Sequence, residues 1–70
     1  MQAIYTNHAR KRMAQRGITE EDIEAALADP QITYSDPDGN RRFVRWFGDR
    51  RVQVVIVDNR EPYIIKTVID

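Results

Sequence analysis

The chain has 70 residues, a formal net charge of zero, a single histidine and no cysteine. A chain this short is expected to fold as one domain over residues 1–70, and without cysteine it holds neither a disulfide framework nor a thiolate zinc site. One histidine excludes a His-rich metal cage, so no metal and no cofactor are expected. The sequence has no apolar run long enough for a membrane span or a secretory signal, which favours a cytoplasmic protein.

The zero net charge is a cancellation between segments of opposite sign. Residues 1–18 carry four basic and no acidic side chains, residues 19–40 carry seven acidic and no basic ones, and residues 41–70 carry seven basic and four acidic ones. Nine of the eleven cations are arginine, whose planar guanidinium suits phosphate and carboxylate alike. The two basic segments can form an anion site if folding brings them together; alternatively, they pair internally with the acidic segment.

A first helix is predicted over residues 8–16. Thr6 or Asn7 can cap its N-terminus with a side-chain oxygen. Gly17 can end it, because glycine adopts the left-handed conformation at little cost.

A second helix is predicted to begin after Thr19 and to end by about residue 28. Three acidic residues follow Thr19, where the helix dipole favours negative charge, and Asp22 among them can act as the capping-box residue. Pro30 then prevents the helix from continuing.

Beyond residue 30 the pattern becomes one of strands and turns. Strands are predicted over residues 31–35, 41–47, 51–58 and 63–69, with turns over residues 36–40, 48–50 and 59–62. The expected fold is therefore α+β, with two N-terminal helices packed on one face of a four-stranded antiparallel β-sheet. Both sides of the strand over residues 41–47 are partly apolar, and we expect Val44 and Trp46 to face the core.

One side of the first helix carries the clearest chemical signal. At about 100° per residue, His8, Arg12 and Arg16 fall within a stripe roughly 80° wide, beside the apolar side of the helix. We call these three residues the histidine–arginine stripe. The structural interpretation of the arginines is that their stems cover the core edge while their guanidinium groups pair with carboxylates of the second helix, such as Glu24.

His8 adds a catalytic interpretation to the stripe. The helix dipole and Arg12 both disfavour a protonated imidazole, so we expect His8 to be neutral at neutral pH. A neutral imidazole beside two guanidinium groups can support metal-free RNA cleavage, because it can take the ribose 2′-hydroxyl proton while the cations stabilise the phosphorane. A lone histidine at a helix start is, however, more often a local capping or packing residue.

The residues of the stripe and their neighbours resemble a family signature. The pattern H-A-x-x-R-M-x-x-R-G-I is matched by His8, Ala9, Arg12, Met13, Arg16, Gly17 and Ile18. It is similar to that of a small bacterial family of domains of unknown function, which is grouped with the RelE and barnase type ribonuclease fold of toxin–antitoxin systems. The resemblance implies a single RelE-like toxin-family domain over residues 1–70. It further implies that the stripe lines a ribonuclease cleft together with Thr67 on the last strand.

Further nucleic-acid contacts are expected from the strands. Arg45 lies between two phenylalanines on one side of its strand and can contact phosphate beside a stacking surface, and Arg42 offers a second cation. Lys66 has suitable chemistry for a phosphate. Because strand residues alternate, Lys66 and Thr67 are expected to point to opposite faces, so that only one of them joins a given cleft.

Two functions from different classes follow from these patterns. The first is a metal-independent endoribonuclease of the toxin–antitoxin type, with His8 as general base or acid, Arg12 and Arg16 holding phosphate, and Thr67 in support. Its partners are RNA and a cognate antitoxin protein. The second is a non-catalytic domain of the same fold that binds a protein partner through its oppositely charged segments. A homodimer through an exposed sheet edge is compatible with either function.

Overall fold

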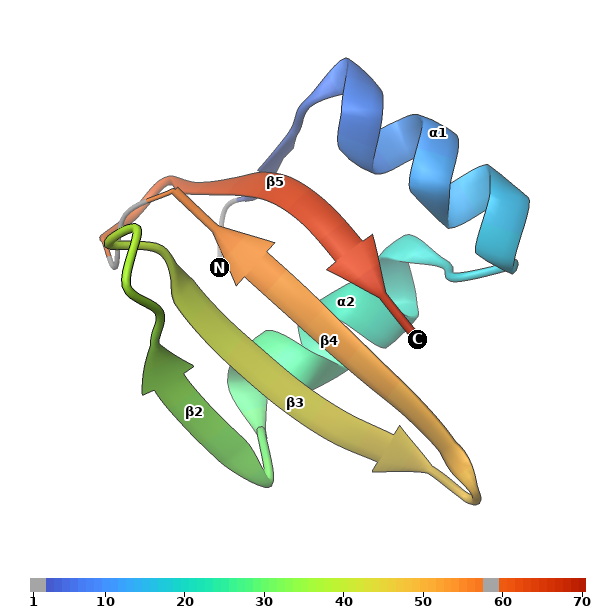
Figure 1. Cartoon of the computed structure of the whole chain (residues 1–70). Helices are drawn as coiled ribbons and strands as arrows, with labels where there is room; N and C mark the ends of the chain where they lie inside the picture. Colours follow the sequence, from blue (N-terminus) through green and yellow to red (C-terminus); the bar gives the residue numbers. More distant parts are fainter. Residues whose placement is uncertain (1–2, 58–59) are drawn as a thin grey trace.

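The computed structural model describes residues 3–57 and 60–70 (Figure 1). The elements follow the order β1 (Ala3–Tyr5), α1 (Asn7–Arg16), α2 (Glu20–Ala28), β2 (Ile32–Ser35), β3 (Arg41–Phe47), β4 (Arg50–Ile56) and β5 (Tyr63–Ile69). Within these residues, five strands form one sheet in the order β1-β5-β4-β3-β2. The β1–β5 pair is parallel and the other pairs are antiparallel. The fold is α+β with two helices, but the prediction of a four-stranded antiparallel sheet is wrong.

The strand missed by the prediction is β1, and it makes the sheet mixed. It pairs in register with the start of β5, Ala3 opposite Tyr63 and Tyr5 opposite Ile65. Three residues are too few to show a strand periodicity, and the partner strand lies at the far end of the chain. A parallel pair also needs a long crossover connection, which the intervening elements supply.

The helix ends are built as the sequence indicates. The Thr6 side chain accepts a hydrogen bond from the backbone N–H of Ala9 at 3.1 Å, and Gly17 ends α1 with a φ of 65°. At the start of α2, the Thr19 side chain accepts from the Asp22 N–H at 3.1 Å, and the Asp22 carboxylate accepts from the Thr19 N–H at 3.0 Å. The predicted capping box is therefore confirmed.

The predicted strands differ from the observed ones mainly at the ends of β4. This strand begins at Arg50, which pairs with Phe47, because residues 48–49 alone make the turn. The predicted strand end at Asp58 and the turn beginning at Asn59 lie outside the described residues. The bounds of β3 and β5 agree with the prediction.

Both helices pack on one face of the sheet, which we call the helix face (Figure 1). Its core is formed by Ala9, Met13, Ile18, Ile23, Ala26, Leu27, Phe43, Val52, Val54, Ile56, Ile65 and Val68. α1 packs mainly on β5, and α2 packs on β3 and β4.

The opposite face of the sheet, which we call the open face, has no helix over it in the described part of the chain. The strand register assigns it Ile4, Ile32, Tyr34, Arg42, Val44, Trp46, Arg51, Gln53, Val55, Val57, Ile64, Thr67 and Ile69.

The two sides of β3 are the reverse of the predicted ones. Phe43 belongs to the core of the helix face, whereas Val44 and Trp46 lie on the open face, where Val44 is buried as predicted. Trp46 is 37% exposed, so the prediction that it faces the core is wrong. The pairing with β4 supplies the reason: Phe43 is opposite apolar Val54, and Trp46 is opposite Arg51. The β3 sequence alone, apolar on both sides, does not contain this information.

Candidate functional site

The histidine–arginine stripe lies on the side of α1 that faces away from α2. On the opposite side of the helix, Arg10 pairs with Glu20 of α2 at 3.1 Å, and its guanidinium lies 4.7 Å from the centroid of the Tyr5 ring. The inward side of the helix buries Ala9 and Met13. Rotation by about 100° per residue then places the stripe along the outer side of the helix, beside β5.

Thr6 fixes the N-terminal end of the stripe to β5. Its backbone N–H donates to the Ile65 carbonyl at 3.2 Å, and its hydroxyl lies 3.1 Å from the carbonyls of both Ile65 and Lys66. The same hydroxyl oxygen accepts from the N–H of Ala9 and so caps α1. One side chain therefore sets both the start of the helix and its place on the strand, and His8 follows two residues later.

At its other end the stripe is tied to the C-terminus of the chain. Arg16 Nε lies 3.6 Å from Asp70 Oδ1, and Arg50 Nη2 lies 3.5 Å from Asp70 Oδ2. Arg50 also donates to the carbonyl of Arg16 and, at 3.3 Å, to that of Gly17. These carbonyls end α1 and have no partner within the helix, so Arg50 satisfies them from the β3–β4 hairpin. Arg16 consequently shares its charge with a carboxylate.

His8 and Arg12 form the part of the stripe that is open to a ligand. Their side chains make no hydrogen bond or ion pair with residues that the structure describes, and His8 is exposed while Arg12 is half-buried. The alternative pairing of Arg12 or Arg16 with a carboxylate of the second helix, such as Glu24, is not observed among these residues; Arg10 makes the interhelical ion pair, and Arg16 pairs with Asp70 of the C-terminus.

A β-bulge in β5 brings Lys66 and Thr67 to one position of the ladder. Thr67 is opposite Val55 and Ile65 is opposite Ile56, so Lys66 is an extra residue in β5. The residues on either side of the pair are buried in the core, whereas Lys66 is exposed and Thr67 is half-buried. The expectation of strict alternation at this pair is wrong because the bulge interrupts the two-residue period.

Thr67 and the histidine–arginine stripe lie on different sides of β5. The register places Thr67 on the open face, while α1 covers the helix face. Beyond Ile65 the outer edge of β5 has no strand partner among the described residues, because β1 ends at Tyr5. The histidine–arginine stripe and Thr67 therefore lie on opposite sides of this free edge, with Lys66 beside the edge. They do not line one concave cleft.

Arg45 is engaged at the C-terminus of α2. Its Nη1 donates to the Asp29 carbonyl at 2.7 Å and lies 2.9 Å from the Asp29 carboxylate, and its guanidinium lies 5.5 Å from the Phe47 ring centroid. Contacts of this kind neutralise the carbonyl end of a helix. Arg45 thus holds α2 on the sheet, and a phosphate at this position would have to displace Asp29.

Arg42 is engaged with Asp36, which follows β2. Arg42 Nε donates to Asp36 Oδ2 at 2.8 Å, and the Asp36 side chain is 6% exposed. This hydrogen bond is the main reason that the pKa of Asp36 lies below its ordinary value; backbone N–H groups of Asn40 and Asp38 also lower it, while burial opposes the shift. The charge of Arg42 is therefore largely compensated.

The open face carries a polar network that the sequence analysis missed. Arg51 donates to Gln53 at 2.7 Å, Gln53 donates to the Tyr34 hydroxyl at 3.0 Å, and the Arg51 guanidinium lies 5.9 Å from the Trp46 ring centroid. Gln53 is buried and links three strands through these contacts. The signal in the sequence was the alternation of Arg51 and Gln53 with valines, which marks one polar side of β4.

Exposed large apolar side chains are confined to the open face within the described residues. They are Ile4, Ile32, Tyr34, Trp46, Val57 and Ile64. The charged side chains that the strand register assigns to this face, Arg42 and Arg51, are both cationic. The open face is therefore apolar and basic, whereas the acidic segment lies mostly in and after α2.

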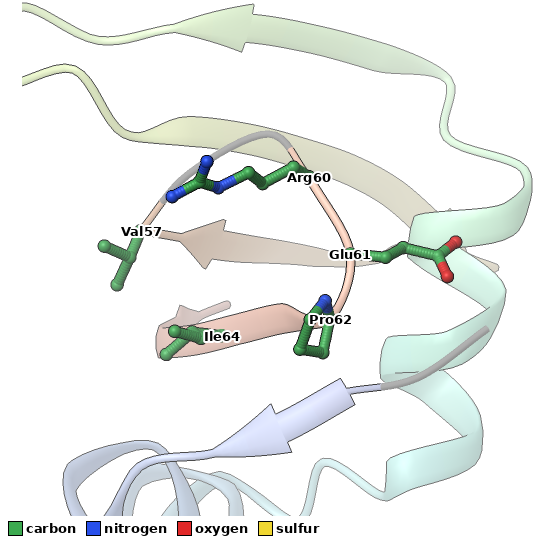
Figure 2. A pocket seen from close by; sticks show the side chains of 5 residues that line it. All are labelled: Val57, Arg60, Glu61, Pro62 and Ile64. Atoms are coloured by element: carbon green, nitrogen blue, oxygen red, sulfur yellow. The ribbon is translucent and has the colours of Figure 1, made fainter.

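A pocket of about 260 Å³ lies at the connection between β4 and β5 (Figure 2). It is lined by Val57, Arg60, Glu61, Pro62 and Ile64, with the Glu61 side chain directed away from Val57 and Ile64. None of the predicted site residues lines it. No group of three or more potential metal ligands occurs in residues 3–57 and 60–70, and no helix there is long and apolar enough to cross a membrane.

The comparisons with known proteins identify a family but no function. Residues 5–70 match the family described as "Domain of unknown function (DUF4258)". No curated protein and no solved structure matches the chain. The match runs from the end of β1 to the C-terminus and so includes the stripe, the β5 bulge and the open-face network. The chain belongs to the DUF4258 family, as the resemblance to a small family of domains of unknown function predicted.

Proposed function

We propose that this domain is a metal-independent ribonuclease that holds RNA along the outer edge of β5, with His8 as general base or acid. The observation that carries the proposal is the availability of His8 and Arg12. They lie one helical turn apart on the outer side of α1, and neither side chain is paired with a described carboxylate. A basic group beside uncompensated cations is what cleavage of a phosphodiester requires.

The proposed reaction is an intramolecular transesterification. The His8 imidazole takes the proton of a ribose 2′-hydroxyl, and the 2′-oxygen forms a bond to the adjacent phosphorus while the bond from phosphorus to the 5′-oxygen breaks. The departing 5′-oxygen takes up a proton from an imidazolium or from water, which leaves a 2′,3′-cyclic phosphate and a 5′-hydroxyl. Because negative charge accumulates on the phosphoryl oxygens, a cation at this point lowers the barrier.

The cations of the site differ in how freely they can act. Arg12 has no partner among residues 3–57 and 60–70 and is the best placed to bind the reacting phosphate, whereas Arg16 shares its charge with Asp70. Lys66, at the bulge, can hold a neighbouring phosphate on the strand edge. Thr67 can support the RNA only where the chain passes over that edge onto the open face.

Internal ion pairs favour this function over a protein-binding domain that works through oppositely charged segments. Three acidic residues of the segment over residues 19–40 already form ion pairs within the domain, namely Arg10–Glu20, Arg42–Asp36 and Arg45–Asp29. The resemblance to RelE-like toxins supports RNA as the substrate class. It also implies a cognate antitoxin protein as partner and the cytoplasm as the place of action.

The test uses a fluorescently labelled single-stranded RNA incubated with the purified protein in EDTA. Cleavage should proceed in EDTA and produce 2′,3′-cyclic ends, and His8→Ala should slow it about 10²-fold to 10⁴-fold. Asn7→Ala, an exposed substitution in the same turn, is the matched control and should retain activity. Absent cleavage, or cleavage that survives His8→Ala unchanged, would sink the catalytic proposal.

A further inference from the structure

An exposed tryptophan on an uncovered sheet is the least expected surface feature of this small domain. Trp46 and Tyr34 on the open face are 37% and 41% exposed. The histidine–arginine stripe on α1 does not account for either ring. Aromatic rings offered to solvent beside cations are the usual means by which proteins hold unpaired nucleic-acid bases.

The two rings are held in place before any ligand arrives. Gln53 connects the Tyr34 hydroxyl to Arg51, and Arg51 lies over the Trp46 ring. Gln53 itself is only 3% exposed, so the centre of this network is fixed in the sheet. Such an arrangement reduces the ordering that binding would otherwise require.

The charge of the open face matches a polyanion. The strand register assigns Arg42 and Arg51 to this face and no carboxylate, and Lys66 lies at its edge through the bulge. Asp36, which follows β2, forms an ion pair with Arg42.

We infer that the open face binds single-stranded nucleic acid, with bases stacked on Trp46 and Tyr34 and phosphates held by Arg51 and Lys66. The inference rests on the proposed function in that it takes the same RNA as ligand and extends its site. Trp46 and Thr67 are two strands and four ladder positions apart, or roughly 16 Å at ordinary strand spacing and rise. A stacked strand covers this span with roughly five nucleotides at about 3.4 Å each.

Trp46 is the chain's only tryptophan, so its fluorescence reports on the open face. The probe is an eight-nucleotide 2′-O-methyl oligouridylate, which has a blocked 2′-oxygen and cannot undergo the proposed cleavage. An abasic strand of the same length and charge is its control. The oligouridylate should quench Trp46 saturably and bind at least about tenfold more tightly than the abasic strand, because stacking contributes to one and not to the other.

Variants separate stacking from charge, with binding measured by the anisotropy of a labelled oligouridylate. Trp46→Leu should weaken binding about tenfold or more, and Trp46→Phe, which keeps a ring, should retain most of it. Arg51→Gln should lower the slope of log affinity against log salt by about 0.7. Arg10→Gln removes the same charge from the far side of α1 and should change neither affinity nor slope by a comparable amount.

The outcomes that overturn the inference differ from those that overturn the proposed function. Equal binding of the two strands, or unchanged binding by Trp46→Leu and Tyr34→Leu, would show that the open face does not stack bases. Trp46 fluorescence that changes with protein concentration alone, with a dimer in sedimentation, would assign the face to a second copy of the chain and also overturn it. The oligouridylate has a blocked 2′-oxygen, so its binding is measured without cleavage and a failed cleavage assay is read independently.

Discussion

The helix face and the open face of the sheet both bury apolar side chains, but by different means. On the helix face two helices exclude water from residues such as Ile65. On the open face no described helix is present, and yet Val44 and Val55 are 1% exposed. Long side chains of the same face, linked through Gln53, lie around them. The valines of the open face are therefore shielded by side chains of the sheet itself, and the aromatic rings in that layer remain partly exposed to solvent.

The largest difference between the faces should be seen at two adjacent isoleucines of β5. Ile65 is fully buried on the helix face, whereas Ile64 is 38% exposed on the open face. Ile65→Ala should destabilise the protein by about 2–5 kcal/mol, enough to unfold much of a domain of this size. Ile64→Ala should lower the free energy of unfolding by less than about 1 kcal/mol. Urea denaturation followed by Trp46 fluorescence gives both values, and similar losses would contradict the division into two faces.

Substitution of Thr6 should have the next largest effect on stability, because Thr6 connects α1, which covers the helix face, to strand β5. Thr6→Val removes the cap of α1 and the hydroxyl contact to β5, and should lower the free energy of unfolding by about 1–2 kcal/mol. Thr19→Val removes the cap of α2 but no hydrogen bond to the described part of the sheet, so its effect should be smaller, about 1 kcal/mol. If Thr19→Val proves the more damaging of the two, the contact with β5 has little energetic importance.

Gln53 is the corresponding link on the open face, and its loss should have a smaller effect. Both of its partners, Tyr34 and Arg51, reach solvent, so Gln53→Leu leaves no deeply buried polar group without a partner. The expected change in stability is below about 1 kcal/mol. The spectrum of Trp46 should nevertheless shift, because Arg51 loses the acceptor that holds it over the ring. A severe loss of stability would show that the network is part of the core.

Sequence reasoning succeeded where the controlling contacts are local. The cap at Thr19 and the glycine at the end of α1 depend on residues within a few positions, and each is built as predicted; of the two predicted caps of α1, Thr6 is the one used. The match of residues 5–70 to a family of domains of unknown function was likewise predicted from a continuous motif around α1.

Sequence reasoning failed where distant strands decide the outcome. β1 is defined by its pairing with β5, and the side of Trp46 is fixed by its pairing with Arg51. No glycine or proline in the β5 sequence indicates the bulge at Lys66. The candidate site was affected in the same way: the stripe on α1 follows from helical spacing, but its separation from Thr67 depends on the register of β5.

The smallest effect on stability at neutral pH is expected at the edge of the open face, where Arg42 forms an ion pair with Asp36. This hydrogen bond lowers the pKa of Asp36 below its ordinary value of 3.8, so folding favours the charged carboxylate. The resulting stability is fully present above about pH 4 and is lost as the pH falls through the lowered value. Asp36→Asn should therefore reduce the midpoint of urea unfolding at pH 7. The difference in midpoint between this variant and the natural sequence should become smaller as the pH falls toward 2.

Asp38→Asn makes the same change of charge two residues away, where the side chain makes no ion pair or hydrogen bond with the described residues. It should show no comparable pH-dependent difference. Asp36→Asn should also bind the oligouridylate more tightly, because Arg42 loses its carboxylate partner. This gain in binding would contrast with the variant's loss of stability. A variant that loses both stability and binding would indicate that Asp36 shapes the open face and does not merely neutralise a cation on it.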